Sequence, residues 1–142
     1  MIALDKVKEI LCTEQATCVI NFNENVYISH ERGVKPLLKL IDEKCDVNGG
    51  AAADKVVGKA AAMLYVLLGV EELYALVISE LAIEALEKYG VAVSYEKRVP
   101  MIRNRTDTGF CPMEQATKDI DTPNEALLVI RAKLQELQNL GK

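Results

Sequence analysis

The chain has 142 residues, half of them hydrophobic and about a quarter charged, and its formal net charge is −4. This size predicts a single domain over residues 1–142 that buries a core. The acidic balance argues against a nucleic-acid-binding protein, since such proteins carry basic surfaces. The longest apolar run, residues 60–70, is too short to cross a membrane.

The N-terminal segment and the cysteines indicate the compartment. Residues 1–10 carry charges within their apolar pattern and have no small-residue cleavage site, so they do not predict a secretory signal. The four cysteines include no Cys-x-x-Cys pair, which is typical of reduced thiols. We therefore expect a cytoplasmic protein, with neither a nucleic acid nor a membrane as its partner.

Apolar periodicity and the placement of Gly and Pro predict an alternation of helices and strands. Gly49 and Gly50 stand before a long helix, and Gly69 is expected to end it. In chain order we expect a helix over 4–11, a hairpin of strands 17–22 and 26–29, a helix from Pro36 to Ile41, a helix over about 52–68, a strand over 73–78, a helix over 79–89, a strand over 91–95, an extended segment over 100–105, and helices beginning at Cys111 and Thr122.

The order of these elements indicates the fold class. A hairpin followed by strand–helix–strand alternation predicts an α/β protein, a three-layer α/β/α sandwich with a mixed sheet. The continuous apolar run over 73–78 is typical of a central strand that is covered on both faces. Right-handed crossover connections make this strand and the strand over 91–95 the expected parallel neighbours.

Four short sequence words, spread over nearly the whole chain, carry a resemblance to a known family: Glu31–Leu37, Ala53–Ala60, Ile78–Glu80 and Cys111–Glu114. With its order of elements, the chain resembles the cytidine-deaminase-like fold. It resembles more closely a small prokaryotic family of unknown function that has this fold and lacks the zinc-binding motif.

The resemblance also suggests where zinc chemistry would lie. Zinc deaminases carry His-x-Glu or Cys-x-Glu at the start of the buried helix, and Pro-Cys-x-x-Cys after the next strand. The equivalent positions here are Ala52 with Asp54, and Ala82 with Ala85. The three positions of the zinc ligands are therefore occupied by alanine, which cannot bind a metal. We therefore expect no metal, no cofactor and no zinc-dependent deamination. Whether the protein is an enzyme stays open.

Charged residues at the start of the long helix are the first candidates for a binding site. Asp54 is interpreted either as a cap stabilised by the helix dipole or as a ligand contact. Lys55 and Lys59 lie four residues apart on one helical face, where they are either solvated or attract phosphate or carboxylate beside a cleft.

Cys111 is the candidate for chemistry. It precedes Pro112 at a helix start, where a thiolate faces the positive end of the helix and can act as a nucleophile. The only histidine that could serve as its base is His30, and nothing in the spacing supports that pair. The alternative interpretation of Cys111 is a buried cap, and Cys12, Cys18 and Cys45 are interpreted as small core hydrophobes.

Two basic segments are candidate anion sites. Arg103, Asn104 and Arg105 lie in the extended segment, where the two guanidinium groups point to one side and form a fork suited to an anion. Surface salt bridges are the alternative for them. Arg32 and Lys35 flank Gly33 on a loop that leads into a helix, and a helix start can bind an anion through its N–H groups.

Ser79 and Glu80 complete the set, because they follow the central strand at its carboxyl end, where open α/β sheets place ligands. The sequence therefore predicts a deaminase-like protein without zinc chemistry that binds a small anionic or nucleotide-like ligand. The residues expected to contact the ligand are Arg32, Lys35, Asp54, Lys55, Ser79, Glu80, Arg103, Asn104 and Arg105.

Two alternatives of other classes stay open. One is a non-catalytic interaction module that forms a homo-oligomer, for which the stripe Leu127–Leu137 of the last helix is either a dimer seam or part of the core. The other is a zinc-free enzyme in which Cys111 is the nucleophile and Asp54 belongs to the catalytic site.

Overall fold

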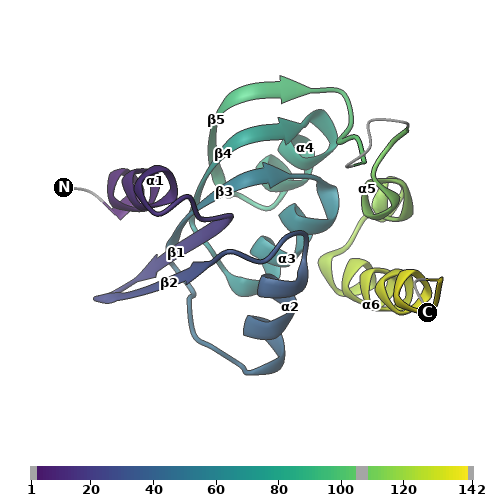
Figure 1. Ribbon diagram of the computed structural model, residues 1–142, viewed down its shortest axis with the longest axis horizontal. Helices are drawn as coiled ribbons and strands as arrows, with labels where there is room; N and C mark the ends of the chain where they lie inside the picture. The colour runs from purple at the N-terminus through teal and green to yellow at the C-terminus, as the bar shows by residue number, and fades with distance from the viewer. Residues whose placement is uncertain (1–2, 105–108, 141–142) are drawn as a thin grey trace.

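The computed structural model describes residues 3–104 and 109–140, and its centre is a five-stranded mixed sheet with strand order β2-β1-β3-β4-β5 (Figure 1). The elements in chain order are α1 (Ala3–Thr13), β1 (Cys18–Phe22), β2 (Asn25–Ser29), α2 (Lys35–Asp42), β3 (Ala51–Val57), α3 (Lys59–Leu68), β4 (Glu72–Ser79), α4 (Glu80–Lys88), β5 (Ala92–Val99), α5 (Pro112–Thr117) and α6 (Pro123–Leu140). The predicted α/β class with a mixed sheet is confirmed.

The expected hairpin is present, and it forms one edge of the sheet. β1 pairs with β2 antiparallel, and Asn23 in the turn takes a positive φ of 55°, which suits the asparagine of a tight connection. β1 also pairs antiparallel with β3, so that Cys18 lies opposite Asp54. This register brings a thiol and a carboxyl group from distant parts of the sequence side by side.

The prediction of a long helix over about 52–68 is wrong for the first half of this range. Residues 51–57 form strand β3, and helix α3 begins only at Lys59, after Gly58. Alanine favours helices, but β3 lies between β1 and β4 with both faces covered, and tertiary packing overrides local propensity. The small side chains let the layers on either side approach the strand closely.

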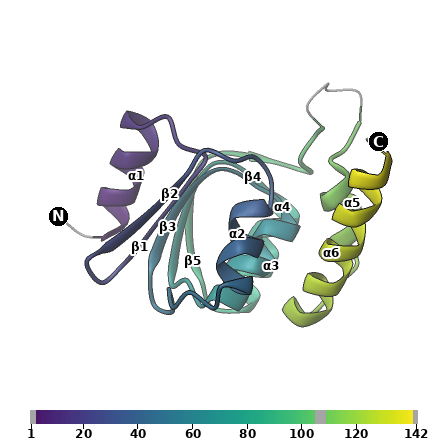
Figure 2. The same cartoon turned by 60° about the horizontal axis from the view of Figure 1, so that its bottom comes forward.

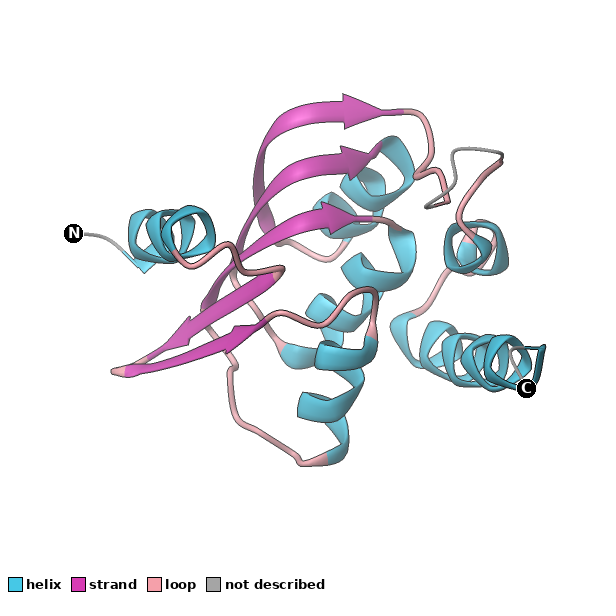
Figure 3. Cartoon of the chain, in the orientation of Figure 1, coloured by secondary structure: helices cyan, strands magenta, loops and turns pink. Residues whose placement is uncertain are grey.

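The expected parallel pairing of the strands over 73–78 and 91–95 is confirmed by β4 and β5. β3, β4 and β5 are parallel neighbours, connected through α3 and α4, as the colours by element in Figure 3 show. Gly69 ends α3 with a φ of 78°, the left-handed conformation expected of a C-cap. Ser79 caps α4, because its hydroxyl accepts a hydrogen bond from the Ala82 N–H at 3.1 Å.

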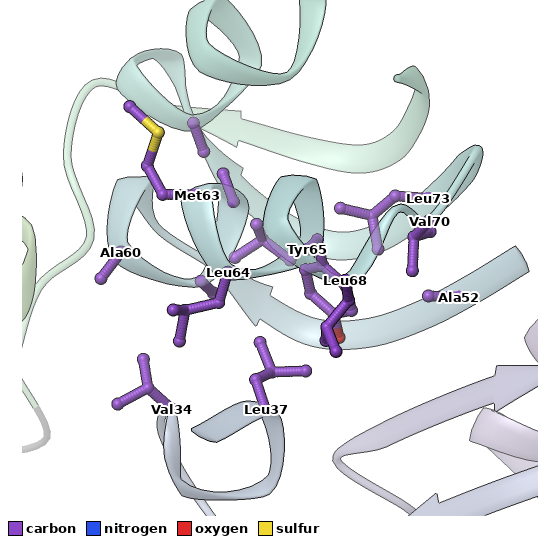
Figure 4. Close-up of a cluster of buried hydrophobic side chains, with 14 of the residues drawn as sticks. Val34, Leu37, Ala52, Ala60, Met63, Leu64, Tyr65, Leu68, Val70 and Leu73 are labelled. Atoms are coloured by element: carbon purple, nitrogen blue, oxygen red, sulfur yellow. The ribbon is translucent and has the colours of Figure 1, made fainter. Parts of the chain in front are cut away.

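Helices cover both faces of the sheet. α1 lies against one face, while α2, α3 and α4 cover the other, and α5 and α6 pack on the outer side of α3 (Figure 2). A smaller core lies under α1 around Val7, Leu11 and Tyr74. The larger core surrounds α3, which is buried along most of its length (Figure 4). Within the described residues, no helix has the length and apolarity needed to cross a membrane.

Candidate functional site

A cavity of about 620 Å³ opens where the carboxyl end of β3 meets α2, α3, α5, α6 and the segment after β5. Its wall combines charged and polar side chains with apolar ones. Residues that line it are Thr17, Cys18, Glu31, Arg32, Gly33, Val34, Lys35, Pro36, Leu37, Asp54, Lys55, Val56, Gly58, Ala60, Ala61, Ile102, Arg103, Asn104, Cys111, Pro112, Met113, Glu114, Leu134 and Leu137. Segments far apart in the sequence thus share one hollow.

Four basic residues line the cavity: Arg32, Lys35, Lys55 and Arg103. All four are exposed, so they lie toward its mouth. The guanidinium of Arg103 lies 5.6 Å from the centre of the Phe110 ring, a cation–π distance that favours one orientation of the side chain. Asn104 lines the cavity beside it, and Arg105 lies outside the described residues. The structure thus brings both predicted basic segments to one cavity.

Asp54 is not the helix cap that the sequence suggests, since it lies within β3 and is only 9% exposed. The Tyr65 hydroxyl donates a hydrogen bond to its Oδ2 at 2.6 Å, and the Val56 N–H donates to its Oδ1 at 3.2 Å. Burial raises the pKa of the Asp54 carboxyl to about 7, although these hydrogen bonds oppose the shift. A carboxyl group that titrates near neutrality therefore faces the cavity.

The Tyr65 hydroxyl and the Cys18 thiol continue the hydrogen-bonded cluster around Asp54, and neither was expected there from the sequence. Tyr65 is fully buried on α3 (Figure 4), and its hydroxyl lies 3.1 Å from the Cys18 sulfur. Cys18 is buried as expected of a core cysteine, and burial raises the pKa of its thiol and of the Tyr65 phenol. Neither group is therefore ionised near neutral pH. Cys18 lies opposite Asp54 in the register of β1 and β3, and Tyr65 reaches both from α3, so no short-range sequence pattern could reveal the cluster.

Lys55 and Lys59 do not share a helical face, which corrects the second expectation for this segment. Lys55 belongs to β3, whereas Lys59 is the first residue of α3. The Lys59 ammonium donates to the Lys118 carbonyl oxygen at 2.8 Å and does not line the cavity. Only Lys55 of the pair is placed to contact a ligand there.

Glu114 is the residue whose role sequence reasoning missed most completely. Its carboxylate is 1% exposed and accepts hydrogen bonds from the Lys59 N–H (2.7 Å), the Ser79 hydroxyl (3.1 Å) and the Ile102 N–H (2.8 Å). These donors lie at the start of α3, at the cap of α4 and in the segment after β5. One carboxylate therefore joins three elements to α5, and the sequence indicated it only as part of a helix-start pattern.

Gly58 explains why the entry of α3 is built from small residues. A Cβ atom at this position would lie 3.2 Å from Glu114 Oε2 and 3.2 Å from Ile102 Cγ1, closer than ordinary contact. The glycine therefore gives the Glu114 carboxylate access to the first N–H of the helix, where the helix dipole favours a negative charge. The group that approaches this helix start is a side chain of the same protein.

The residues around the two helix starts do not fit a zinc ion. The buried helix α3 begins at Lys59, after Gly58. Ala52 and Asp54, the residues equated with the deaminase motif at the start of this helix, therefore lie before it in the chain. Ala82 and Ala85 do lie in the first turns of α4, where they present methyl groups. The described part of the chain contains no group of three His, Cys, Asp or Glu residues that could hold a metal.

Ser79 and Glu80 lie at the carboxyl end of β4 as expected, but they do not line the cavity. Ser79 is fully buried and serves the helix cap and the Glu114 carboxylate. Glu80 is exposed, and its carboxylate lies 3.7 Å from Arg98 Nε. Ser79 thus acts on the cavity only through Glu114.

Cys111 lines the cavity together with Asp54. It precedes α5 as expected, but its side chain makes no capping hydrogen bond, and its N–H donates to the Ile102 carbonyl oxygen at 2.8 Å. His30 does not line the cavity, and its Nε2 lies 3.1 Å from the Glu14 carbonyl oxygen. Cys111 therefore shares the cavity with Asp54 and not with His30.

Comparison with known proteins gives a family and two structural relatives. The family model of the TM1506 domain of unknown function, DUF1893, matches residues 6–134. The crystal structure of a DUF1893 protein, TM1506 from Thermotoga maritima, is similar with a TM-score of 0.85 and 25% identity, over 92% of this chain and 89% of that chain. A weaker likeness links the chain to the dCMP deaminase of the cyanophage S-TIM5 in its apo form, with a TM-score of 0.43 and 11% identity, over 68% of this chain and 94% of that chain. A search of the curated proteins finds no match.

Proposed function

The chain belongs to the DUF1893 family, and we propose that its cavity binds a small anionic ligand of the phosphorylated, nucleotide-like kind. The observation that carries the proposal is the convergence of Arg32, Lys35, Lys55 and Arg103 on one cavity of about 620 Å³. These residues come from the loop before α2, from α2, from β3 and from the segment after β5. A net attraction for anions at one mouth follows, because basic side chains in a concave site focus their field there.

The acidic residues of the cavity do not cancel this attraction. Glu31 is exposed, but the Glu114 carboxylate is already held by three hydrogen-bond donors. Burial favours the neutral form of Asp54 up to a pH of about 7. The balance at the mouth is therefore positive on a protein whose net charge is −4.

The inner wall supplies an apolar surface of the kind that ligand pockets use to hold a ring or an alkyl group. Val34 and Leu37 near the start of α2 lie on one side, and Ala60 of α3 lies on the other (Figure 4). Half-buried apolar residues, Ile102, Met113, Leu134 and Leu137, also line the cavity. The cavity thus suits a molecule with an anionic end and an apolar body.

The test is a thermal-shift and calorimetric screen against nucleotides, phosphorylated metabolites and inorganic phosphate. A true ligand at about 100 times its dissociation constant should stabilise the protein by about 2.7 kcal/mol. The double variant Arg32→Gln, Lys35→Gln should weaken binding at least tenfold, because it removes two charges from the mouth. Lys97→Gln is the matched control, since Lys97 is an exposed lysine of β5 that does not line the cavity.

Two results would count against this function. If no compound of the screen stabilises the protein, the non-catalytic oligomeric module becomes the better interpretation, and light scattering gives its assembly state. If the double variant binds as tightly as the wild type, the anion site does not lie at this cavity.

A second candidate function is favoured by one observation, the shared cavity of Cys111 and Asp54. In this alternative the protein is a zinc-free enzyme, with Cys111 as the nucleophile. A ligand found in the screen should then be consumed, as followed by proton NMR, and Cys111→Ser should abolish turnover while binding persists. Unchanged ligand after prolonged incubation with the wild type would reject the enzyme.

A further inference from the structure

The cavity has a charge polarity that its basic mouth alone does not reveal. Arg32, Lys35, Lys55 and Arg103 are all exposed, whereas the Asp54 carboxyl is nine-tenths buried. The Tyr65 hydroxyl donates to this carboxyl group at 2.6 Å and lies 3.1 Å from the sulfur of Cys18, which lines the cavity. A molecule that enters therefore passes a basic rim and meets an acidic group at the inner end.

Asp54 retains capacity to accept further hydrogen bonds. A carboxylate has about four acceptor sites, and the partners of Asp54 are the Tyr65 hydroxyl and N–H groups of its own strand. No ion pair among the described residues includes Asp54. Above its pKa of about 7 the Asp54 carboxyl group is a buried charge without a cation, which is unfavourable, so a donor from outside would relieve a real cost.

We infer that the cavity selects ligands that carry, besides their anionic group, an amino group or a similar N–H donor, which the Asp54 carboxylate receives. This inference rests on the proposed anion site and specifies its substrate class. A protonated amine against a buried carboxylate forms a charge-assisted hydrogen bond, which is stronger than a neutral one. The half-buried side chains of Ile102, Met113 and Leu134 also line the cavity, and they suit the carbon skeleton that joins the two groups.

The experiment uses a chemical ruler, a series of ω-aminoalkyl phosphates with two to six carbons. Each is compared by calorimetry with the alkyl phosphate of the same length, which lacks the amine. The measurements are made at pH 8, above the pKa of about 7 of the Asp54 carboxyl, so that both the carboxylate and the ammonium are charged. Inorganic phosphate is the probe for the anion site alone.

We expect one chain length to bind about tenfold or more tightly than its alkyl counterpart, which is the range of a hydrogen bond to a charged group. Asp54→Asn should reduce this preference to less than twofold while the affinity for the alkyl phosphate stays the same. The matched control is Asp5→Asn, which neutralises an exposed carboxylate on α1, on the opposite face of the sheet. The wild-type comparison needs no variant, so it tests the amine preference of the cavity even if Asp54→Asn fails to fold.

The possible failures are distinguishable. If alkyl phosphates and inorganic phosphate bind but no amine improves affinity, the anion site stands and the role of Asp54 is refuted. If an amine preference persists in Asp54→Asn, another group receives the amine and the assignment is wrong. If no phosphate compound binds at all, the proposed function and this inference fall together.

Discussion

Asp54 and Glu114 are both buried carboxyl groups of one cavity, yet their surroundings differ. Glu114 accepts hydrogen bonds from two backbone N–H groups and a hydroxyl, which stabilise its charge. Asp54 lies in a less polar environment, and the desolvation of its charged form outweighs its hydrogen bonds. Two residues of one chemical type therefore differ in their surroundings, one joining the elements of the wall and the other lining the cavity.

The raised pKa of Asp54 predicts a pH dependence of stability. The pKa rises from an ordinary 3.8 to about 7 on folding, so the folded protein keeps this proton over a range in which the unfolded chain has lost it. The contribution of the Asp54 proton to the free energy of unfolding is therefore complete below pH 4. It falls by up to about 4 kcal/mol as the pH rises to about 7.

The measurement is the free energy of urea unfolding at pH values from 4 to 8, for the wild type and for Asp54→Asn. The difference between the two proteins should change over this range, with the wild type losing stability relative to the variant. Asp5→Asn should follow the wild type. Parallel curves for wild type and Asp54→Asn would show that the Asp54 pKa does not change on folding.

Substitution of Glu114 should weaken the fold. In Glu114→Gln an amide N–H₂ group meets a backbone N–H where a carboxylate oxygen was, and the resulting unsatisfied donor should cost about 2 kcal/mol. Glu114→Ala should cost more, because it leaves three donors without their acceptor. Urea unfolding measures both, with Glu84→Gln on the exposed side of α4 as a control expected within about 0.5 kcal/mol of the wild type. Equal stability of Glu114→Gln and the wild type would contradict this account.

At the scale of elements, α6 closes the cavity from outside. Leu134 and Leu137 on its C-terminal half are half-buried and line the wall, while Arg131 binds the Asp42 carboxylate of α2 at 2.6 Å. Both Asp42 and Arg131 are exposed, so this ion pair adds little stability. The cover depends instead on the apolar contacts of the helix with α3 and α5.

The contribution of α6 to binding can be tested with a pair of leucines. Leu137→Ala removes part of the cavity wall. The affinity for the ligand should fall severalfold, which corresponds to about 1 kcal/mol of lost apolar contact. Leu128→Ala is the control, because Leu128 is 70% exposed on the same helix and does not line the cavity. Calorimetry with a ligand from the screen gives both affinities, and similar values for the two variants would exclude a role of α6 in the site.

For the whole molecule, local signals predicted the elements whose sequence and surroundings agree. The hairpin, β4, the Ser79 cap and the Gly69 stop all follow from short-range patterns of apolar, capping and turn residues. The helix predicted in place of β3 was wrong, because the alanines of this segment favour a helix. The neighbouring strands that determine its conformation lie far away in the sequence. The local pattern could not contain that information.

The site shows the same limit. Its residues were largely predicted as single candidates, because basic residues on loops and small residues at a helix start are visible in the sequence. The hydrogen bonds that hold these residues in the site join positions far apart in the sequence. Asp54 and Tyr65 are 11 positions apart, and Lys59 and Glu114 are 55 positions apart. Such pairings arise from the sheet order and the helix packing.

The phenol of Tyr65 also offers a practical advantage. The chain contains no tryptophan and five tyrosines, so its intrinsic ultraviolet emission comes from tyrosine alone. A phenol that donates to a neighbouring carboxylate, as this one does at 2.6 Å, loses emission through that partner. A ligand that takes the place of the Tyr65 hydroxyl at Asp54 should therefore change the tyrosine emission, and a titration of the unlabelled protein tests this.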